Sequence, residues 1–352
     1  MADAFANSIM VDALNRERAG IVQPDSTLYA PGLDGNALDR PKDLERWEPW
    51  VRAYTALGEL LQGIVFDFNQ TTYAVSVAFA YVDPPGTPGS YQIASIDRPK
   101  EAVFQAQVPL VINWATLREE RATEIMAQID PPYAFWSSVI YMHPARTRWT
   151  MELINIMLQF CVYVEMRFKH ALGCWRPVEY NPQVQPMITT PGHGSFPSGH
   201  ATQAFAVAQL LDSLLYLGST GVPGLASVRE QLRLQAARIA TNRVIAGVHF
   251  PIDSMAGRML GTALADFFVA RCASPHSFTD RSFNSAALIG NPSLEFNPYD
   301  LGTQDMDTPG IGLYSKGASH TLSPTSHPNG QSALLHRIWR KAVREWRGKF
   351  GR

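Results

Sequence analysis

The stretch from Ser195 to Thr202 reads Ser-Phe-Pro-Ser-Gly-His-Ala-Thr and stands directly before an apolar helix. The apolar positions of that helix are Ala204, Phe205, Val207, Ala208, Leu210, Leu211, Leu214 and Leu215. The first N–H groups of a helix lack partners within it, and the helix dipole makes that end positive. The turn therefore predicts a cradle for a tetrahedral oxyanion such as phosphate or vanadate. A histidine held there, His200, would move protons near neutral pH.

A segment upstream offers two cations. Residues from about Arg148 to Leu172 have apolar side chains at helical spacing, and they predict a helix that stops at Gly173 before the breaker Pro177. Lys169 then lies in the last turn and Arg176 just beyond it, so both can converge on one anion. The alternative is a pair of ordinary C-terminal helix cations, which the dipole favours.

A segment downstream adds a third cation and a second histidine. A helix is predicted from about Val228 to Ala246, and Gly247 relaxes the chain before His249. His249 is a candidate in-line nucleophile or ligand of an oxyanion centre, and Asp253 is a candidate for holding its other ring nitrogen. By itself, a histidine near a helix end is more often a satisfied core residue.

The three segments occur in one order, as Lys169-x6-Arg176-Pro177, Pro197-Ser198-Gly199-His200 and Arg243-x5-His249-x3-Asp253. This pattern resembles the three-part signature of the type 2 phosphatidic acid phosphatase superfamily, which includes bacterial acid phosphatases and vanadium-dependent haloperoxidases. The resemblance covers about residues 150 to 272. One departure is Asn242, where the family usually has serine; because Asn242 is also polar, we expect anion binding to persist.

The resemblance implies that vanadate is the bound cofactor and that phosphate would occupy the same site. The implied contacts of the oxyanion are Lys169, Arg176, Ser198, Gly199, His200, Arg243 and His249. Of these, His249 would bond to the central atom, vanadium or phosphorus, and His200 would be the acid–base group. Asp253 would orient His249. Three permanent cations agree with this, since together they hold a multiply charged anion out of water.

Two features favour the soluble haloperoxidase branch of the superfamily. About 168 residues precede Lys169, and these haloperoxidases have a large helical region before the first motif. His193 lies seven residues before His200, where algal vanadium bromoperoxidases have a second active-site histidine. The alternative for His193 is a solvated residue in a Gly/Pro loop. Next to three cations, both histidines are expected to have lowered pKa values.

The expected function is therefore that of a vanadium-dependent haloperoxidase that uses hydrogen peroxide, a halide and an organic acceptor. Haloperoxidases also carry an acidic partner for the acid–base histidine, and the candidates are Glu119, Glu120 and Asp130. The alternative is an acid phosphatase that forms a phosphohistidine at His249 while His200 protonates the leaving alcohol. A third alternative is a catalytically silent anion-binding protein that works through its C-terminal helix.

Composition limits the remaining possibilities. The chain has 352 residues, 46% of them hydrophobic, which is enough for a sizeable core. Its net charge of −1 argues against nucleic acid as a partner. Mean hydropathy is −0.10, and the apolar runs are shorter than the roughly 20 residues of a membrane span. Without a signal-peptide pattern or a disulfide framework, we expect a cytoplasmic protein; homo-oligomerisation is left open.

The expected fold class is all-α, a helical bundle of the acid phosphatase/vanadium haloperoxidase type with an irregular C-terminal extension. Its expected parts are an N-terminal arm (1–45), a helical catalytic domain (46–272, motif core 150–272), an irregular surface wrap (273–330) and a basic amphipathic helix (331–352). The stretch from Phe68 to Val82 fits a strand or a buried helix.

Two further helices are expected after the third motif. The first runs from Asp253 to Arg271, and Gly257 and Gly261 would let it pack closely. The second lies between Ser332 and Arg352, which contains seven Lys/Arg. This basic amphipathic helix can bind an anionic membrane or a partner, or dock on its own domain.

Overall fold

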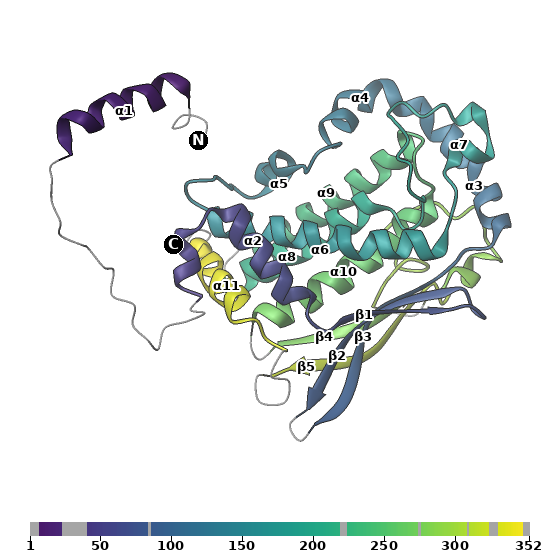
Figure 1. Cartoon of the computed structure of the whole chain (residues 1–352). Helices are drawn as coiled ribbons and strands as arrows, with labels where there is room; N and C mark the ends of the chain where they lie inside the picture. Colours follow the sequence, from purple (N-terminus) through teal and green to yellow (C-terminus); the bar gives the residue numbers. More distant parts are fainter. Residues whose placement is uncertain are drawn as a thin grey trace. The chain divides into compact units, whose positions relative to one another are not determined.

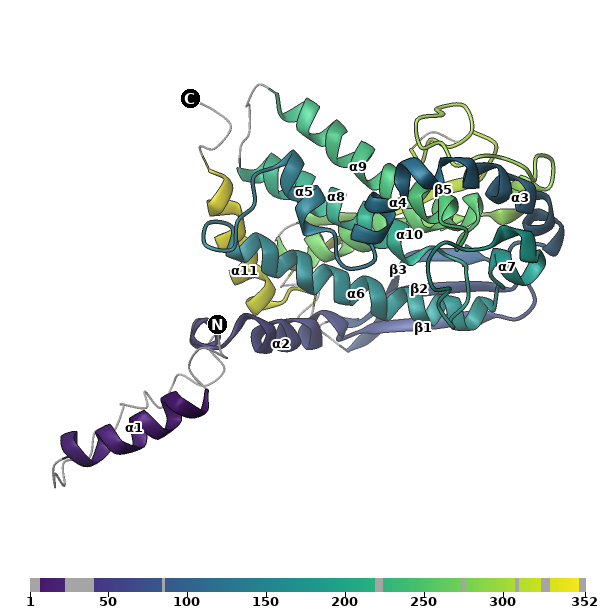
Figure 2. The same cartoon turned by 90° about the horizontal axis from the view of Figure 1, so that it is seen from above.

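The computed structural model describes residues 7–22, 41–83, 86–218, 224–273, 276–307, 310–323 and 330–347. The chain divides into two compact units, residues 1–40 and 41–352. In the first unit, helix α1 spans Ser8–Ile21, and the Asn7 side chain caps it by accepting a hydrogen bond from the Met10 N–H at 2.8 Å. The second unit holds all the other elements, which Figures 1 and 2 show from two directions.

Helices α2 to α11 and strands β1 to β5 form the second unit. The helices are α2 (Pro49–Leu61), α3 (Glu101–Trp114), α4 (Arg118–Ala127), α5 (Tyr133–Val139), α6 (Arg148–Leu172), α7 (Pro177–Tyr180), α8 (Gly199–Gly218), α9 (Leu225–Ile245), α10 (Pro251–Cys272) and α11 (Ala333–Trp346). The strands are β1 (Ile64–Asn69), β2 (Ala74–Asp83), β3 (Thr87–Asp97), β4 (His276–Phe283) and β5 (Tyr314–Leu322). Short 3-10 turns lie at Asp43–Arg46, Ala115–Leu117, Pro182–Val184 and Ser285–Leu288.

A five-stranded sheet packs against the helices, so the expected all-α class is wrong (Figure 1). The strands lie in the order β1-β2-β3-β4-β5. Neighbours are antiparallel except for β3 and β4, which run parallel. Because Ala94 of β3 pairs with Arg281 of β4, the sheet joins the region before the three motifs to the region after them.

Strand β2 shows the alternation of a half-buried strand. Val75, Val77 and Phe79 are buried, and the residues between them are only partly so. The stretch from Phe68 to Val82, for which both strand and helix were open, comprises the end of β1, a turn and most of β2. This stretch forms strand because its β-branched and aromatic side chains pack well on the half-buried face of a sheet.

The expected irregular C-terminal extension is also wrong, since β4 and β5 lie within residues 273–330. Strand β4 pairs with β3 only from Ala94 to Ile96, and most positions of β5 are exposed. Phe278 and Phe283 supply the buried contacts of β4. Polar strands with one solvated face and few inward residues show little hydrophobic periodicity, so the residue pattern did not indicate β4 and β5.

Helices α8 and α10 approach each other closely behind the motifs. A Cβ atom on Gly261 would lie 2.1 Å from the Thr202 carbonyl oxygen, and one on Gly257 would lie 2.7 Å from the Ser198 carbonyl oxygen. Only glycine permits this approach, so the predicted close packing of the 253–271 helix is confirmed. As a result, the first turn of α8 lies beside the first turns of α10.

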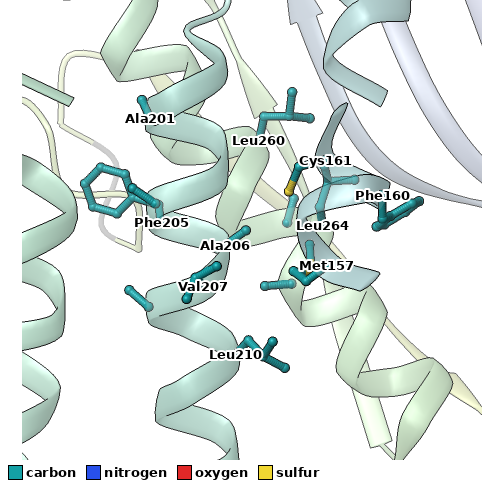
Figure 3. Close-up of a cluster of buried hydrophobic side chains, with 14 of the residues drawn as sticks. Met157, Phe160, Cys161, Ala201, Phe205, Ala206, Val207, Leu210, Leu260 and Leu264 are labelled. Carbon is teal, nitrogen blue, oxygen red and sulfur yellow. The ribbon is translucent and has the colours of Figure 1, made fainter. Parts of the chain in front are cut away.

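Apolar side chains from α6, α8 and α10 fill the space between these helices. The cluster in Figure 3 includes Met157 and Cys161 of α6 together with Leu260 and Leu264 of α10. Phe267 of α10 carries the core on to the sheet, where its ring centroid lies 5.7 Å from that of Phe79 and 5.3 Å from that of Phe278. The sheet therefore backs the helices that position the motifs.

The C-terminal helix α11 docks on its own domain. Its apolar side chains Leu334, Leu335, Ile338, Trp339, Ala342 and Trp346 are buried. The Glu345 carboxylate accepts hydrogen bonds from the Trp149 and Thr150 N–H groups, each at 3.0 Å, and so caps the start of α6. The amphipathic stripe is thus used within the chain. Among the described residues, no helix has both the length and the apolar composition that crossing a bilayer requires.

Candidate active site

His249 and Asp253 are positioned by the turn between α9 and α10. Gly247 in this turn has a φ of 82°, a left-handed conformation that favours glycine. Asp253 lies in the first turn of α10, where its carboxylate accepts the Phe250 N–H at 3.0 Å. This capping bond fixes the side chain beneath the preceding loop. The same carboxylate oxygen is 2.8 Å from Nδ1 of His249.

Asp253 is fully buried and holds its charge through hydrogen bonds. Besides the His249 ring, its Oδ2 accepts the Ser195 hydroxyl and the Phe250 N–H. Burial raises the pKa of Asp253 to about 6, while the bonds from Ser195 and Phe250 oppose that rise. Asp253 is therefore ionised at neutral pH, as a carboxylate that orients a histidine must be.

The hydrogen bonds of His249 define its tautomer. Its Nε2 lies 3.0 Å from Nη1 of Arg176, and a guanidinium can only donate. Nε2 therefore carries the lone pair, and the ring proton is on Nδ1, where Asp253 accepts it. Burial lowers the pKa of His249 well below its ordinary value, and Arg176 and Lys169 lower it further. The ring is thus neutral, with its basic nitrogen facing a cation.

Ser198 and Gly199 form the entry to α8. The Ser198 N–H donates to the Asp253 carbonyl at 2.9 Å and so links the starts of α8 and α10. The Ser198 oxygen accepts the Ala201 N–H at 3.4 Å, which leaves its own hydroxyl proton free to donate. A Cβ atom on Gly199 would lie 2.8 Å from Oε1 of Glu165, so the Glu165 carboxylate of α6 lies close against this turn.

His200 is held by the C-terminal end of α4. Its Nε2 lies 2.9 Å from the carbonyl oxygen of Gln128, which can only accept, so Nε2 carries the proton and Nδ1 the lone pair. Burial lowers the pKa of His200 to about 4, and Arg243 is the next cause. The pKa of His193 is also lowered, again mainly by desolvation. The predicted direction holds for both histidines, although burial outweighs the neighbouring cations.

The three candidate acidic partners of His200 lie elsewhere. Glu119, Glu120 and Asp130 are exposed, and Glu120 pairs with Arg121 at 3.0 Å. The group that His200 contacts is a backbone carbonyl of the same segment. Motif spacing cannot indicate such a contact, because every residue carries a carbonyl.

Lys169 organises the loop before α8. It is 2% exposed, and its Nζ donates to the carbonyl oxygens of Gly194 at 3.2 Å, Ser195 at 2.9 Å and Pro197 at 2.5 Å. Burial lowers the pKa of Lys169 to about 8. All three ammonium protons are thus used to hold residues 194–197, in contrast to the direct anion contact that the resemblance implied. An entering oxyanion would share this ammonium with the loop.

Arg176 bridges the His193 loop and the His249 segment. Its Nη1 donates to the Val248 carbonyl at 2.8 Å, and its Nη2 is 3.1 Å from Nδ1 of His193. A cavity of about 630 Å³ opens at this side and is lined by Lys169, Arg176, His193 and the exposed ring of Trp175, among others. His193 lies on its wall, while Lys169 and Arg176 are each only 2% exposed, and the residues that line the cavity do not include His249 or Arg243.

Arg243 has N–H donors that no described residue accepts. Its Nη2 donates to the Ile125 carbonyl at 3.0 Å and to Oε1 of Gln128 at 3.2 Å. Its Nε and Nη1 are buried and have no hydrogen-bond partner among the described residues. Unpaired donors of this kind are costly unless a ligand satisfies them. Burial lowers the pKa of Arg243 to about 10, which leaves it charged at neutral pH. The donor set therefore fits phosphate or vanadate.

Sequence reasoning missed the residues behind this cluster. Asn242, fully buried, does not line the site's edge: its Nδ2 donates to Oε1 of Glu124 and Oε1 of Gln128, both at 2.9 Å. Ser195 holds Asp253, and Gln128 contacts both His200 and Arg243. Ser195 lies within the motif run, but nothing in the sequence distinguishes Gln128, the residue after α4, from the other glutamines of the chain.

Comparison with known proteins identifies the part of the chain that carries this cluster. Residues 149–273 match the model of the PAP2 superfamily, and this range contains all nine predicted site residues. None of the curated proteins matches the chain. One similar solved structure is that of a transmembrane PAP2-type phosphatidylglycerolphosphate phosphatase from Bacillus subtilis. It shares 20% identity with a TM-score of 0.36, and the match covers 47% of this chain and 84% of that one.

The match supports the superfamily and does not extend to the haloperoxidase subgroup. It spans α6 to α10, the elements that hold His249, Asp253, Lys169 and Arg243. The sheet, α2 to α5 and α11 lie outside it.

Proposed function

We propose that this protein hydrolyses phosphoesters through a phosphohistidine at His249. The observation that carries the proposal is the fixed tautomer of His249, with Nδ1 bonded to the buried Asp253 and basic Nε2 facing Arg176. An imidazole held in this way is an activated nucleophile with its orienting group in place. The unpartnered donors of Arg243 supply a place for the phosphoryl oxygens.

In the first step, the phosphoryl group binds between Arg243, Arg176 and the start of α8. Nη1–H of Arg176 moves from Nε2 of His249 to a phosphoryl oxygen and so frees the Nε2 lone pair. That lone pair forms a bond to phosphorus while the bond from phosphorus to the alcohol oxygen breaks. The cations stabilise the charge that spreads over the equatorial oxygens, and the neutral ring becomes cationic against the Asp253 carboxylate.

The alcohol needs a proton, and His200 is the group proposed to supply it. In the free protein His200 is neutral at neutral pH because its pKa is about 4. A phosphate dianion next to Arg243 would offset the cationic part of that lowering and favour uptake of a proton from solvent at Nδ1, because Nε2–H stays bonded to the Gln128 carbonyl. The Nδ1 proton is the one that passes to the alcohol. After the alcohol leaves, the same ring would accept a proton from the water that attacks phosphorus, and the Nε2–phosphorus bond of His249 would break.

A haloperoxidase is the second candidate, and His193 is the observation that favours it. His193 lies on the cavity wall with Nδ1 3.1 Å from Arg176. Lys169, Arg176, Ser198, Gly199, Arg243 and His249 would hold vanadate, and vanadate there would supply Lewis-acid activation of hydrogen peroxide toward a halide. Against it, the resemblance implies a carboxylate as the partner of His200, whereas the contact in the structure is the neutral Gln128 carbonyl.

One experiment separates the two candidates. The protein is assayed for hydrolysis of an aryl phosphate, and for halide oxidation by peroxide, each with and without orthovanadate. We expect hydrolysis without vanadate, competitive inhibition by vanadate, and a loss of at least about 10³-fold in His249→Ala. Halide oxidation that depends on vanadate, with negligible hydrolysis, would instead support the second candidate.

His193→Phe is the matched variant for this comparison. The change keeps a ring on the cavity wall and leaves Lys169, Arg243 and His249 untouched. Under the phosphatase proposal it should leave the pH profile of hydrolysis unchanged, since His193 is assigned no proton transfer. Any loss of rate would come from Arg176, whose Nη2 loses its contact with Nδ1 of His193. A shift in halide preference on this change would belong to the haloperoxidase candidate.

A further inference from the structure

Gln128 lies at the point where α4 meets the candidate active site. It is the C-terminal cap of α4 and is fully buried. Its carbonyl oxygen accepts Nε2–H of His200 at 2.9 Å. Its side-chain oxygen accepts Nη2–H of Arg243 at 3.2 Å and Nδ2–H of Asn242 at 2.9 Å. One residue outside the matched PAP2 region thus touches two of the candidate site residues.

The amide of Gln128 is oriented by its neighbours. Both Arg243 and Asn242 present donors, so the side-chain atom between them must be the oxygen. The Gln128 nitrogen is then directed at Glu124, whose Oε1 accepts it at 3.2 Å. Oε2 of Glu124 in turn accepts a hydrogen bond from Nη2 of Arg238 at 2.7 Å, which holds the Glu124 carboxylate in place beside Gln128. The guanidinium of Arg243 is consequently held without meeting a carboxylate directly.

The Gln128 side chain is uncharged, so it leaves the positive charge of Arg243 in the candidate site uncancelled. Arg243 keeps two unpartnered donors, Nε and Nη1, and no neighbouring carboxylate among the described residues hydrogen-bonds it. A carboxylate at position 128 would cancel much of that charge before any oxyanion arrived. The groups that bear electrostatically on His200 are Arg243 from α9 and Lys169 from α6, with His249 nearby.

We infer that Gln128 is a positioning residue that holds Arg243 and His200 around the bound oxyanion and, by being uncharged, leaves the charge of Arg243 for that oxyanion. The assignment rests on the proposed function only in taking the oxyanion to be a phosphoryl group. Its predicted effects appear in binding and in histidine titration, which can be measured without turnover.

The test compares Gln128→Glu with Met126→Glu in the full chain. Met126 lies on the same helix but is 54% exposed, so its variant adds the same charge facing solvent. Inorganic phosphate binding is measured by calorimetry, and the pKa of His200 is measured by NMR titration, with the signal assigned through His200→Asn. Gln128→Met is the second variant, because it removes the amide, keeps the length and adds no charge.

Gln128→Glu should weaken phosphate binding by about tenfold or more and raise the pKa of His200 by about one unit or more. Gln128→Met should weaken phosphate binding several-fold and leave the pKa of His200 nearly unchanged, because the backbone carbonyl remains. Met126→Glu should match the wild type in both. If both Gln128 variants bind phosphate as the wild type does, the inference is overturned. If Gln128→Glu fails to fold, wild-type phosphate binding by Gln128→Met is enough to overturn it.

These outcomes are independent of whether the proposed function holds. If the wild type hydrolyses no phosphoester but Gln128→Glu still weakens phosphate binding and shifts His200, the proposed function fails and the role of Gln128 stands. If hydrolysis occurs and neither quantity moves, the proposed function stands and Gln128 is only a structural cap.

Discussion

The lowered pKa of His200 makes the stability of the protein depend on pH. The ring titrates near 6.5 in the unfolded chain and at about 4 in the folded one. Above pH 6.5 both states hold it neutral, and its contribution to stability is fully present. As the pH falls from 6.5 toward 4, the unfolded chain takes up a proton that the folded one refuses, so stability is lost. Asp253 acts in the opposite sense, because its pKa is raised to about 6.

His200→Asn should remove this part of the pH dependence. At about 1.4 kcal/mol per unit of pKa, the shift corresponds to about 3 kcal/mol. We therefore expect the free energy of unfolding of the wild type to fall by about 3 kcal/mol more than that of His200→Asn between pH 7 and pH 4. Urea unfolding at a series of pH values measures this difference. Curves that stay parallel over the whole range would show that His200 is not desolvated as described.

At the residue scale, the sequence predicted the catalytic candidates better than their contacts. The spacing His249-x3-Asp253 places a carboxylate one helical turn from the ring, and the 2.8 Å bond is present. The first motif, Lys169-x6-Arg176, was compatible with a direct contact between Lys169 and the anion. In the structure, the three ammonium protons of Lys169 are instead donated to backbone carbonyls. The contacts to backbone carbonyls and those of Gln128 with His200 and Arg243 depend on how distant segments pack, so no local sequence pattern predicts them.

At the scale of elements, the close approach of α8 and α10 keeps the motifs together. A methyl group at Gly261 would overlap the carbonyl oxygen of Thr202, two residues after His200 in the chain. That oxygen belongs to a helix backbone and cannot rotate away, so the helices must separate. Separation would move the starts of α8 and α10, which meet through the bond from Ser198 to Asp253.

Gly261→Ala should therefore cost about 1–3 kcal/mol or more of stability and weaken phosphate binding as well. Gly58→Ala is the control, because Gly58 lies within α2 with no atom within 4 Å of the added methyl. That change should be neutral or stabilise by up to about 1 kcal/mol, since alanine favours helix. Thermal unfolding and calorimetry with phosphate measure both effects. Equal stability of the two variants would mean that the helices tolerate a wider spacing.

Element prediction succeeded where the apolar period was long and the ends were marked. Helix α6 has the predicted bounds, and Gly173 ends it with a left-handed φ of 55°. Prediction failed for β4 and β5, whose sequences are mostly polar. Strand β4 pairs with β3, and β5 pairs with β4. Phe278 and Phe283 of β4 are buried against α10 and β5, and the contacts to β3 and α10 depend on how separate segments pack.

At the scale of the whole molecule, the motif core of α6 to α10 is enclosed by parts that the sequence did not relate to it. The sheet backs α10 through β4, α11 caps α6, and Gln128 at the end of α4 contacts His200 of the candidate site. The superfamily match covers only residues 149–273, so the surrounding parts are what distinguish this chain from the common core.

Capture of the covalent intermediate tests the central proposal most directly. The wild type and His249→Ala are mixed with a labelled aryl phosphate, quenched in alkali, digested and analysed by mass spectrometry. We predict label on His249 of the wild type that survives alkali and is lost in acid, with none on His249→Ala. Steady hydrolysis by the wild type with no label on His249, or undiminished hydrolysis by His249→Ala, would contradict the proposal.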